Sequence, residues 1–394
     1  MNDHASDTST LTNLATLLPN STAKRVIEST FTDFAYPVFI SNARGTLLHD
    51  HWLKRMFPPI SPVKTLIETL VPSSEVDTIA DAIVRESRLD RQAIGAIFST
   101  DYQQAYCGAE SPVMSVDEAT GVGEGGHGLD KNLRVICCIV NHNLSDKMAK
   151  AAIDAGAHGP IIYYCEGRGL RDRLGWLRIT KEHEKEVLMI FTDEDDADDV
   201  FDALATAGEL HLPGKGFMYS LPISKGMFNL PSRMSHHHHT ASMQQIIHAI
   251  DQLSGHTHWR DQAIFDLGSH GTSSGFDFIN HRPVYLEDQA CITVLTDRTN
   301  QQRVIDLLLD LHAPGLNISF NRHINPSYGA MINDEYVKIQ SVMSASLSQQ
   351  ICEEISAGAE ANGLKNVFCG VTEVLQVATY TPGNKDYRMP KSAA

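Results

Sequence analysis

The sequence predicts an α+β protein in which a βαββαβ unit occurs three times. Two observations predict this class. Strand-like and helix-like stretches follow one another in the same order in three parts of the 394-residue chain, and these parts share positions of proline, glycine and aromatic residues. We therefore expect units at 10–108, 132–224 and 289–382, with a glycine-rich linker at 109–131 and an insert at 225–288.

The second unit shows the pattern most clearly. LRVICCIV and PIIYYCEG have the composition of buried strands, and between them LSDKMAKAAIDAGA predicts a helix with Ser145 as its N-cap and Gly156 near its end. EVLMIFT predicts a third strand, DEDDADDVFDALATAG a second helix with one apolar face, and FMYSLPI the last strand. The order βαββαβ is that of the ferredoxin-like fold.

The first and third units follow the same order. AKRVIESTFTDFAYPVFISNARGT has the layout of MAKAAIDAGAHGPIIYYCEGRGL, with Pro37 aligned on Pro160 and Arg44 on Arg168. The third unit is more divergent, and its elements are ACITVLT, NQQRVIDLLLDLHA, LNISFNR, EYVKIQSVM, LSQQICEEISAGAEANG and NVFCGVTEV. Three matches in one order indicate triplication.

The composition of the chain argues against several classes of protein. A formal net charge of -16 argues against a nucleic-acid or anionic-membrane binder. Seven cysteines without a C-x-x-C pair are typical of reduced, buried thiols. The N-terminus lacks the pattern of a signal peptide, and no apolar run approaches the roughly 20 residues of a membrane-spanning helix. We expect a cytoplasmic protein.

The stretch HLPGKGFMYSLP places Gly-Lys-Gly between a helix and a strand. A P-loop needs G-x-x-x-x-G-K-[ST] between a strand and a helix, so neither the spacing nor the element order fits. A simple turn is the plainest interpretation. The corresponding loops contain Gly95-Ala96-Ile97 in the first unit and Lys365-Asn366-Val367 in the third, so only the second unit has both the glycine and the lysine.

The second unit resembles the PII signal-transduction family. EKEVLMIFTDEDDADDVFDALATAGELHLPGKGFMYSLPI is similar to that family's second half, and VICCIVNHNLSDKMAKAAIDAGAHGPIIYYCEGRG to its first half. PII proteins are homotrimers of ferredoxin-like subunits that bind adenine nucleotides in clefts between subunits and contact transporters or enzymes through a T-loop. The resemblance implies that one chain forms a pseudo-trimer; a homo-oligomer of triplicated chains is the alternative.

The resemblance also implies a regulatory protein that senses a small-molecule effector, an adenine nucleotide such as ATP or ADP, and signals to a membrane transporter or an enzyme. The residues that match the family's nucleotide site are Gly167, Arg168, Gly169, Arg171, Gly214 and Lys215. Two departures weaken the match. ISKGMFNL follows the fourth strand where the family has Arg-x-Arg, and RGLRDRLGWLRITKEHEK is shorter than a T-loop and lacks tyrosine.

That short segment is a candidate partner-binding loop. Arg173, Trp176 and Arg178 are residue types that concentrate at interface hot spots. A solvated basic hairpin explains them equally well.

Histidines supply a different hypothesis, a metal-binding or metal-sensing protein. The insert contains a run of histidines and a second pair after an amphipathic helix; the candidate ligands are His236, His237, His238, His239, His256 and His258. A flexible polar tract is the alternative. A third function class is an assembly module whose ligand sites have decayed. The common catalytic signatures do not occur in the sequence, so we do not expect an enzyme.

Overall fold

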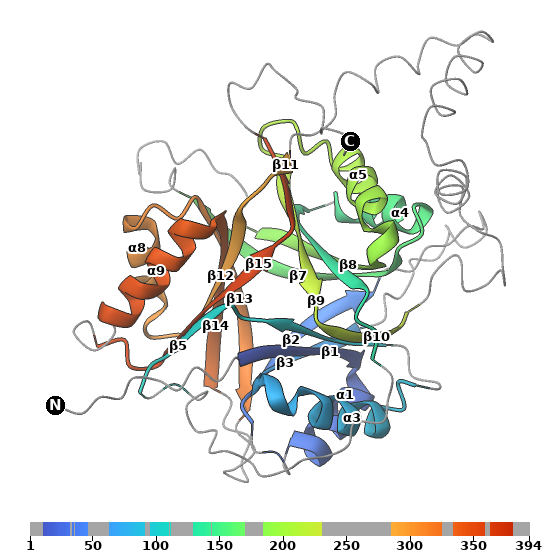
Figure 1. Ribbon diagram of the computed structural model, residues 1–394, viewed down its shortest axis with the longest axis horizontal. Helices are drawn as coiled ribbons and strands as arrows, with labels where there is room; N and C mark the ends of the chain where they lie inside the picture. The colour runs from blue at the N-terminus through green and yellow to red at the C-terminus, as the bar shows by residue number, and fades with distance from the viewer. Residues whose placement is uncertain are drawn as a thin grey trace, which may run out of the picture.

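The computed structural model describes residues 11–31, 34, 36–45, 63–90, 95–109, 111, 129–142, 144–169, 184–230, 285–324, 334–358 and 363–380. These residues form a mixed α and β structure with six α-helices and one large, largely antiparallel network of strands. The helices lie on the outside and the strands face the middle of the molecule (Figure 1).

The first part of the chain forms four strands and two helices. They are β1 (Leu11–Pro19), α1 (Asn20–Val26) with a π-helical turn (Ile27–Phe31), β2 (Val38–Gly45), β3 (Val63–Pro72), α3 (Val76–Ser87) and β4 (Gly95–Asp101). The strands pair antiparallel in the order β4-β1-β3-β2. Ile79, Ile83 and Val84 of α3 recur on one face and are fully buried, which holds the helix on the sheet.

The middle of the chain repeats this arrangement. Its elements are β6 (Leu133–Asn141), α4 (Ser145–Asp154), β7 (His158–Gly169), β8 (Glu184–Asp193), α5 (Ala197–Ala207) and β9 (Gly216–Ile223), paired in the order β9-β6-β8-β7. The sequence predicts Ser145 as the N-cap of α4, but in the structure Ser145 is the first residue of the helix. Its hydroxyl donates a hydrogen bond to Glu186. As an N-cap, its oxygen would accept a hydrogen bond from a backbone N–H of the first turn, whereas here the hydroxyl donates to a buried carboxylate.

The last part of the chain has the same arrangement of four strands and two helices. Its elements are β12 (Gln289–Asp297), α8 (Gln301–Asp310), β13 (Gly315–Ile324), β14 (Asp334–Ser344), α9 (Ala345–Gly358) and β15 (Val367–Val374), in the order β15-β12-β14-β13. The three parts, here called the first, second and third units, therefore share one strand order.

Each unit contributes one short strand to the sheet of a neighbouring unit. These strands follow the fourth strand of each unit and are β5 (Gln104–Cys107), β10 (Lys225–Asn229) and β16 (Gln376–Thr379), with β11 (Tyr285–Leu286) beside β16. β5 pairs with β15 of the third unit, β10 with β4 of the first, and β16 with β9 of the second. The exchange is cyclic, so each unit gives one strand and receives one.

The second strands of the units close a second cycle. The end of β2 pairs with the beginning of β7, the end of β7 with the beginning of β13, and the end of β13 with the beginning of β2. Both cycles run within one chain, and together they join the three sheets around a common centre (Figure 1).

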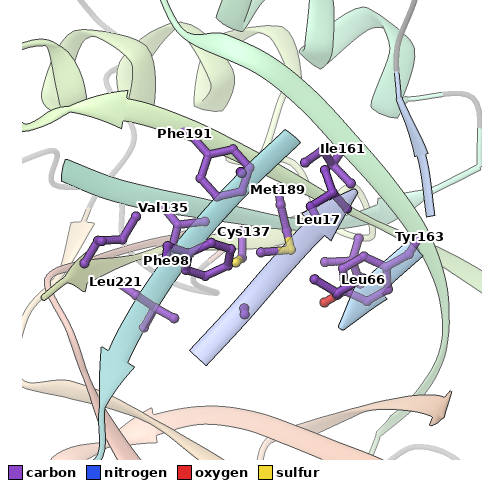
Figure 2. Close-up of a cluster of buried hydrophobic side chains, with 14 of the residues drawn as sticks. Leu17, Leu66, Phe98, Val135, Cys137, Ile161, Tyr163, Met189, Phe191 and Leu221 are labelled. Atoms are coloured by element: carbon purple, nitrogen blue, oxygen red, sulfur yellow. The ribbon is translucent and has the colours of Figure 1, made fainter. Parts of the chain in front are cut away.

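The apolar cores of the molecule follow its division into three units. Each unit has its own apolar core between its helices and its sheet. A fourth core lies between the sheets, where Leu17 and Phe98 of the first unit meet Cys137, Met189 and Phe191 of the second; side chains of β1, β3 and β4 point toward those of β6, β7, β8 and β9 (Figure 2). The rings of Phe98 and Phe191 are 5.2 Å apart between centroids. The inward sheet faces are thus buried by the neighbouring units.

Candidate functional site

The Gly-Lys-Gly loop is shaped by its glycines. After α5 the chain turns through residues 208–215 and enters β9 at Gly216, with φ of 80° at Gly214 and 126° at Gly216, a region that L side chains rarely adopt. A Cβ on Gly216 would lie 2.2 Å from the carbonyl oxygen of Ile139. The side-chain amide of Asn141 donates to the carbonyl of Gly214 at 3.0 Å and anchors the loop to the end of β6.

Lysines gather around this loop. The Nζ atom of Lys215 lies 2.6 Å from Oε2 of Glu209, and Nζ of Lys147 lies 3.6 Å from Oε1 of the same carboxylate. Hydrogen bonding and charge from Lys215, with a smaller contribution from Lys147, lower the pKa of Glu209. Lys185 donates to Asn141, the residue that anchors Gly214. We call Lys147, Lys185 and Lys215 the lysine cluster; two of its ammonium groups pair with the carboxylate of Glu209 and the third donates to Asn141, an arrangement suited to an anion.

Arg168, which the sequence predicts at the same nucleotide site, lies away from the Gly-Lys-Gly loop. It belongs to the end of β7 opposite Leu316 of β13, and its guanidinium donates to Glu166 at 2.9 Å and to Gln302 of α8 at 3.2 Å. Strands β8 and β6 lie between β7 and β9, and Arg168 is three residues beyond the position of β7 that is level with Lys215. At about 4.8 Å per strand and about 3.3 Å per residue, Arg168 and Lys215 are roughly 17 Å apart. Arg168 and its neighbour Gly167 thus stand at the boundary between the second and third units.

Arg44 occupies the matching place at the boundary between the first and second units. Its guanidinium contacts Asp146, in the first turn of α4, at 3.2 Å and the buried carboxylate of Glu186 at 3.2 Å. Asp146 and Gln302 are both the second residue of the helix that an arginine reaches from the preceding unit. The alignment of Arg44 with Arg168 in the sequence therefore corresponds to a shared contact between units.

Several predicted residues lie outside the described part of the chain. These are Arg171, Arg173, Trp176, Arg178 and the histidines His236, His237, His238, His239, His256 and His258. Gly169 is described as the last residue of β7, opposite Gly315. Lys147, Lys185 and Asn141 were not predicted, because their approach to the loop depends on how α4 and β8 pack, which local sequence does not encode. Within the described residues, no group of three or more histidine, cysteine or acidic side chains is placed to hold a metal ion.

A cavity of about 50 Å³ opens at the centre of the molecule, between the three sheets. Its lining includes Phe98 from the first unit, Tyr163 from the second and Gln340 from the third. An ion pair crosses between two units at this cavity: Nζ of Lys338 lies 2.8 and 2.6 Å from the two carboxylate oxygens of Glu68. No feature of the sequence singled out these two residues, since they are 270 positions apart.

Two thiols also line the cavity. Burial raises the pKa of Cys137 to about 12 and that of Cys291 to about 11. Both groups are therefore protonated near neutral pH and are poor nucleophiles. The cavity is a place to bind a molecule rather than to react with it through these cysteines.

Comparisons with known proteins identify no family. No protein-family model and no curated protein matches the chain. Among solved structures the chain is similar to an aspartate kinase from Synechocystis, with 10% sequence identity and a TM-score of 0.19, over 93% of this chain and 43% of that one. The chain thus spans less than half the length of that protein, and the likeness is too low to establish a shared fold. None of the helices in the described residues has the length and apolar character needed to cross a membrane.

Proposed function

We propose that the chain is a PII-like regulatory protein whose three ferredoxin-like units form a pseudo-trimer. The observation that carries this proposal is the pair of strand cycles. β5, β10 and β16 pass between units in one direction, and β2, β7 and β13 pair in a ring. In the PII family three separate subunits surround one axis, and the cyclic exchange of strands among three units of one chain supports a corresponding arrangement here.

The ligand of this sensor is a phosphate-bearing small molecule, an adenine nucleotide, bound at the lysine cluster. Ammonium groups and the loop around Gly214 offer the charge and the donors that phosphate oxygens need. The third unit borders this loop, because Thr379 of β16 pairs with Phe217, the residue after Gly216. Tyr380, the next residue, is 41% exposed and offers a ring on which a base can stack.

Glu209 gives the site an internal competitor. Its carboxylate already holds Lys215 and Lys147, so a phosphate must displace it or share the two lysines with it. Binding would then free Glu209 and shift the loop between two arrangements. A ligand that binds one arrangement of the loop more tightly raises the population of that arrangement, and this change acts on a transporter or an enzyme through the segment that contains Arg173, Trp176 and Arg178.

Calorimetry with ATP, ADP, AMP and cyclic AMP tests the proposal. Lys215→Ala should weaken binding of the preferred nucleotide about tenfold, since one charge-assisted contact is lost. Glu209→Gln should instead strengthen it, because the competing charge is removed while the loop keeps its size. The two variants thus change affinity in opposite directions.

Lys150→Ala is the matched control. Lys150 lies on α4, three residues after Lys147, and is paired with Asp154 at 2.7 Å. It should leave the affinity unchanged. If no nucleotide binds the wild-type chain, or if Lys150→Ala weakens binding as much as Lys215→Ala, the lysine cluster is not a nucleotide site.

A further inference from the structure

The central cavity is polar on one side. Its lining from the third unit is largely polar and consists of Cys291, Thr293, Leu295, Lys338, Gln340 and Thr372. The lining from the second unit is mainly apolar and consists of Val135, Cys137, Tyr163, Met189, Tyr219 and Leu221. Core packing alone would not favour a set of polar side chains on an interior sheet face. The third unit thus provides the polar wall of the central region.

The ion pair adds charge to this wall. Lys338 lies next to β13, opposite Ser319, and only 8% of its side chain is exposed; the value for Glu68 is 13%. The amide of Asn13 is 3.5 Å from Glu68, and the ammonium of Lys338 lies 5.9 Å from the centre of the Tyr163 ring. Two charges taken from water cost free energy, and apolar residues of similar size often stabilise a core equally well. Stability therefore does not explain why this pair borders a cavity.

The neutral ion pair and the small volume of the cavity restrict which ligand can bind there. The pair is electrically neutral, so a singly charged ligand would leave one charge without compensation in a poorly hydrated space. One water-sized group needs about 10–15 Å³ in the same measure of volume, so the cavity accommodates about three to five such groups. A further polar contact is available from the amide of Gln340, which lies 3.2 Å from the hydroxyl of Thr293.

We propose that the central cavity binds a small zwitterion, an α-amino acid of the size of glycine. Its carboxylate contacts the ammonium of Lys338, and its ammonium contacts the carboxylate of Glu68. Charge-assisted hydrogen bonds of both signs then replace the single ion pair. The cavity lies between all three units, so this ligand would act on how the units pack and is independent of the nucleotide site.

Calorimetric titration distinguishes the classes of ligand. The probes are glycine, acetamide, acetate and methylammonium, which are all small and differ in charge. Glycine should bind at least about tenfold more tightly than the other three, the equivalent of one charge-assisted contact. Tighter or equal binding of acetamide, acetate or methylammonium would overturn the zwitterion proposal, and so would the absence of binding by every probe.

Two double variants locate the site. Lys338→Met with Glu68→Leu replaces the cavity pair by apolar residues and should reduce glycine affinity at least about tenfold. Lys225→Met with Asp77→Leu removes another ion pair between units, 2.6 Å long and away from the cavity, and should leave it unchanged. If the first variant binds glycine as the wild type does, the cavity is not the site.

Thr293→Val serves as the test if the double variant at Lys338 and Glu68 does not fold. This substitution removes one polar group from the lining of the cavity and should weaken glycine binding measurably. An unchanged affinity would again contradict the proposal.

Discussion

Replacing Lys338 alone by methionine is expected to lower the free energy of unfolding by about 3–5 kcal/mol. The substitution leaves the carboxylate of Glu68, with its side chain 13% exposed, between two units without its bidentate partner. An unpaired buried charge is more costly than the loss of the contact itself. Denaturant unfolding of the wild-type and variant chains measures the difference.

The double variant and a surface pair provide the controls. Lys338→Met with Glu68→Leu should recover most of the lost stability, because no charge remains buried. Lys225→Met should cost under about 1 kcal/mol, since Asp77 is 50% exposed and water can solvate it. A single Lys338→Met substitution that costs no more than Lys225→Met would show that water reaches Glu68 and that the pair is not truly buried.

Tyr102→Ala is expected to destabilise the chain by about 3–5 kcal/mol. Tyr102 follows β4 and is inserted between the first and third units, where its ring meets Phe368 edge-on with 5.2 Å between centroids. The ring also lies over Gly370, where a Cβ would come within 2.5 Å of it. Alanine would leave a space that neither sheet can close, because the backbone of Tyr102 is held by the carbonyl of Leu11 at 3.0 Å.

Tyr164→Ala is the matched control for this substitution. Tyr164 is 57% exposed on β7, and its removal should change the free energy of unfolding by less than about 0.5 kcal/mol. Thermal or denaturant unfolding compares the two. Equal effects at Tyr102 and Tyr164 would contradict the tight packing of the first unit against the third.

The sequence predicts local features well because local chemistry determines them. Alternation of apolar runs with amphipathic helices predicts the mixed α and β class, and the glycines around Lys215 predict a turn whose φ values indeed require them. The alignment of Arg44 with Arg168 comes from the sequence and corresponds to matching places at two boundaries between units.

Contacts between units could not be predicted in the same way. β5, β10 and β16 contain four or five residues each and show no periodicity that names a partner, so their exchange depends on the assembled sheets. The predicted insert at 225–288 in fact begins with β10, which belongs to the sheet of the first unit. Lys147 joins Glu209 only because α4 packs beside α5, and Glu68 meets Lys338 only because the third strands of two units converge.

A cross-link tests whether the three units close into a ring within one chain. Thr379 of the third unit and Phe217 of the second are antiparallel partners, so cysteines at both positions should be about 4.5–5.5 Å apart between Cα atoms and able to form a disulfide. Thr379→Cys with Val63→Cys, which places the second thiol on an exposed residue of the first unit, is the unpaired control.

Non-reducing electrophoresis and intact mass measure the product after mild oxidation. Thr379→Cys with Phe217→Cys should form a disulfide inside a single 43.4 kDa chain, while the control pair remains reduced. Covalent dimers or trimers formed through residues 379 and 217 would show that β16 pairs with another chain, and would contradict a pseudo-trimer closed within one polypeptide.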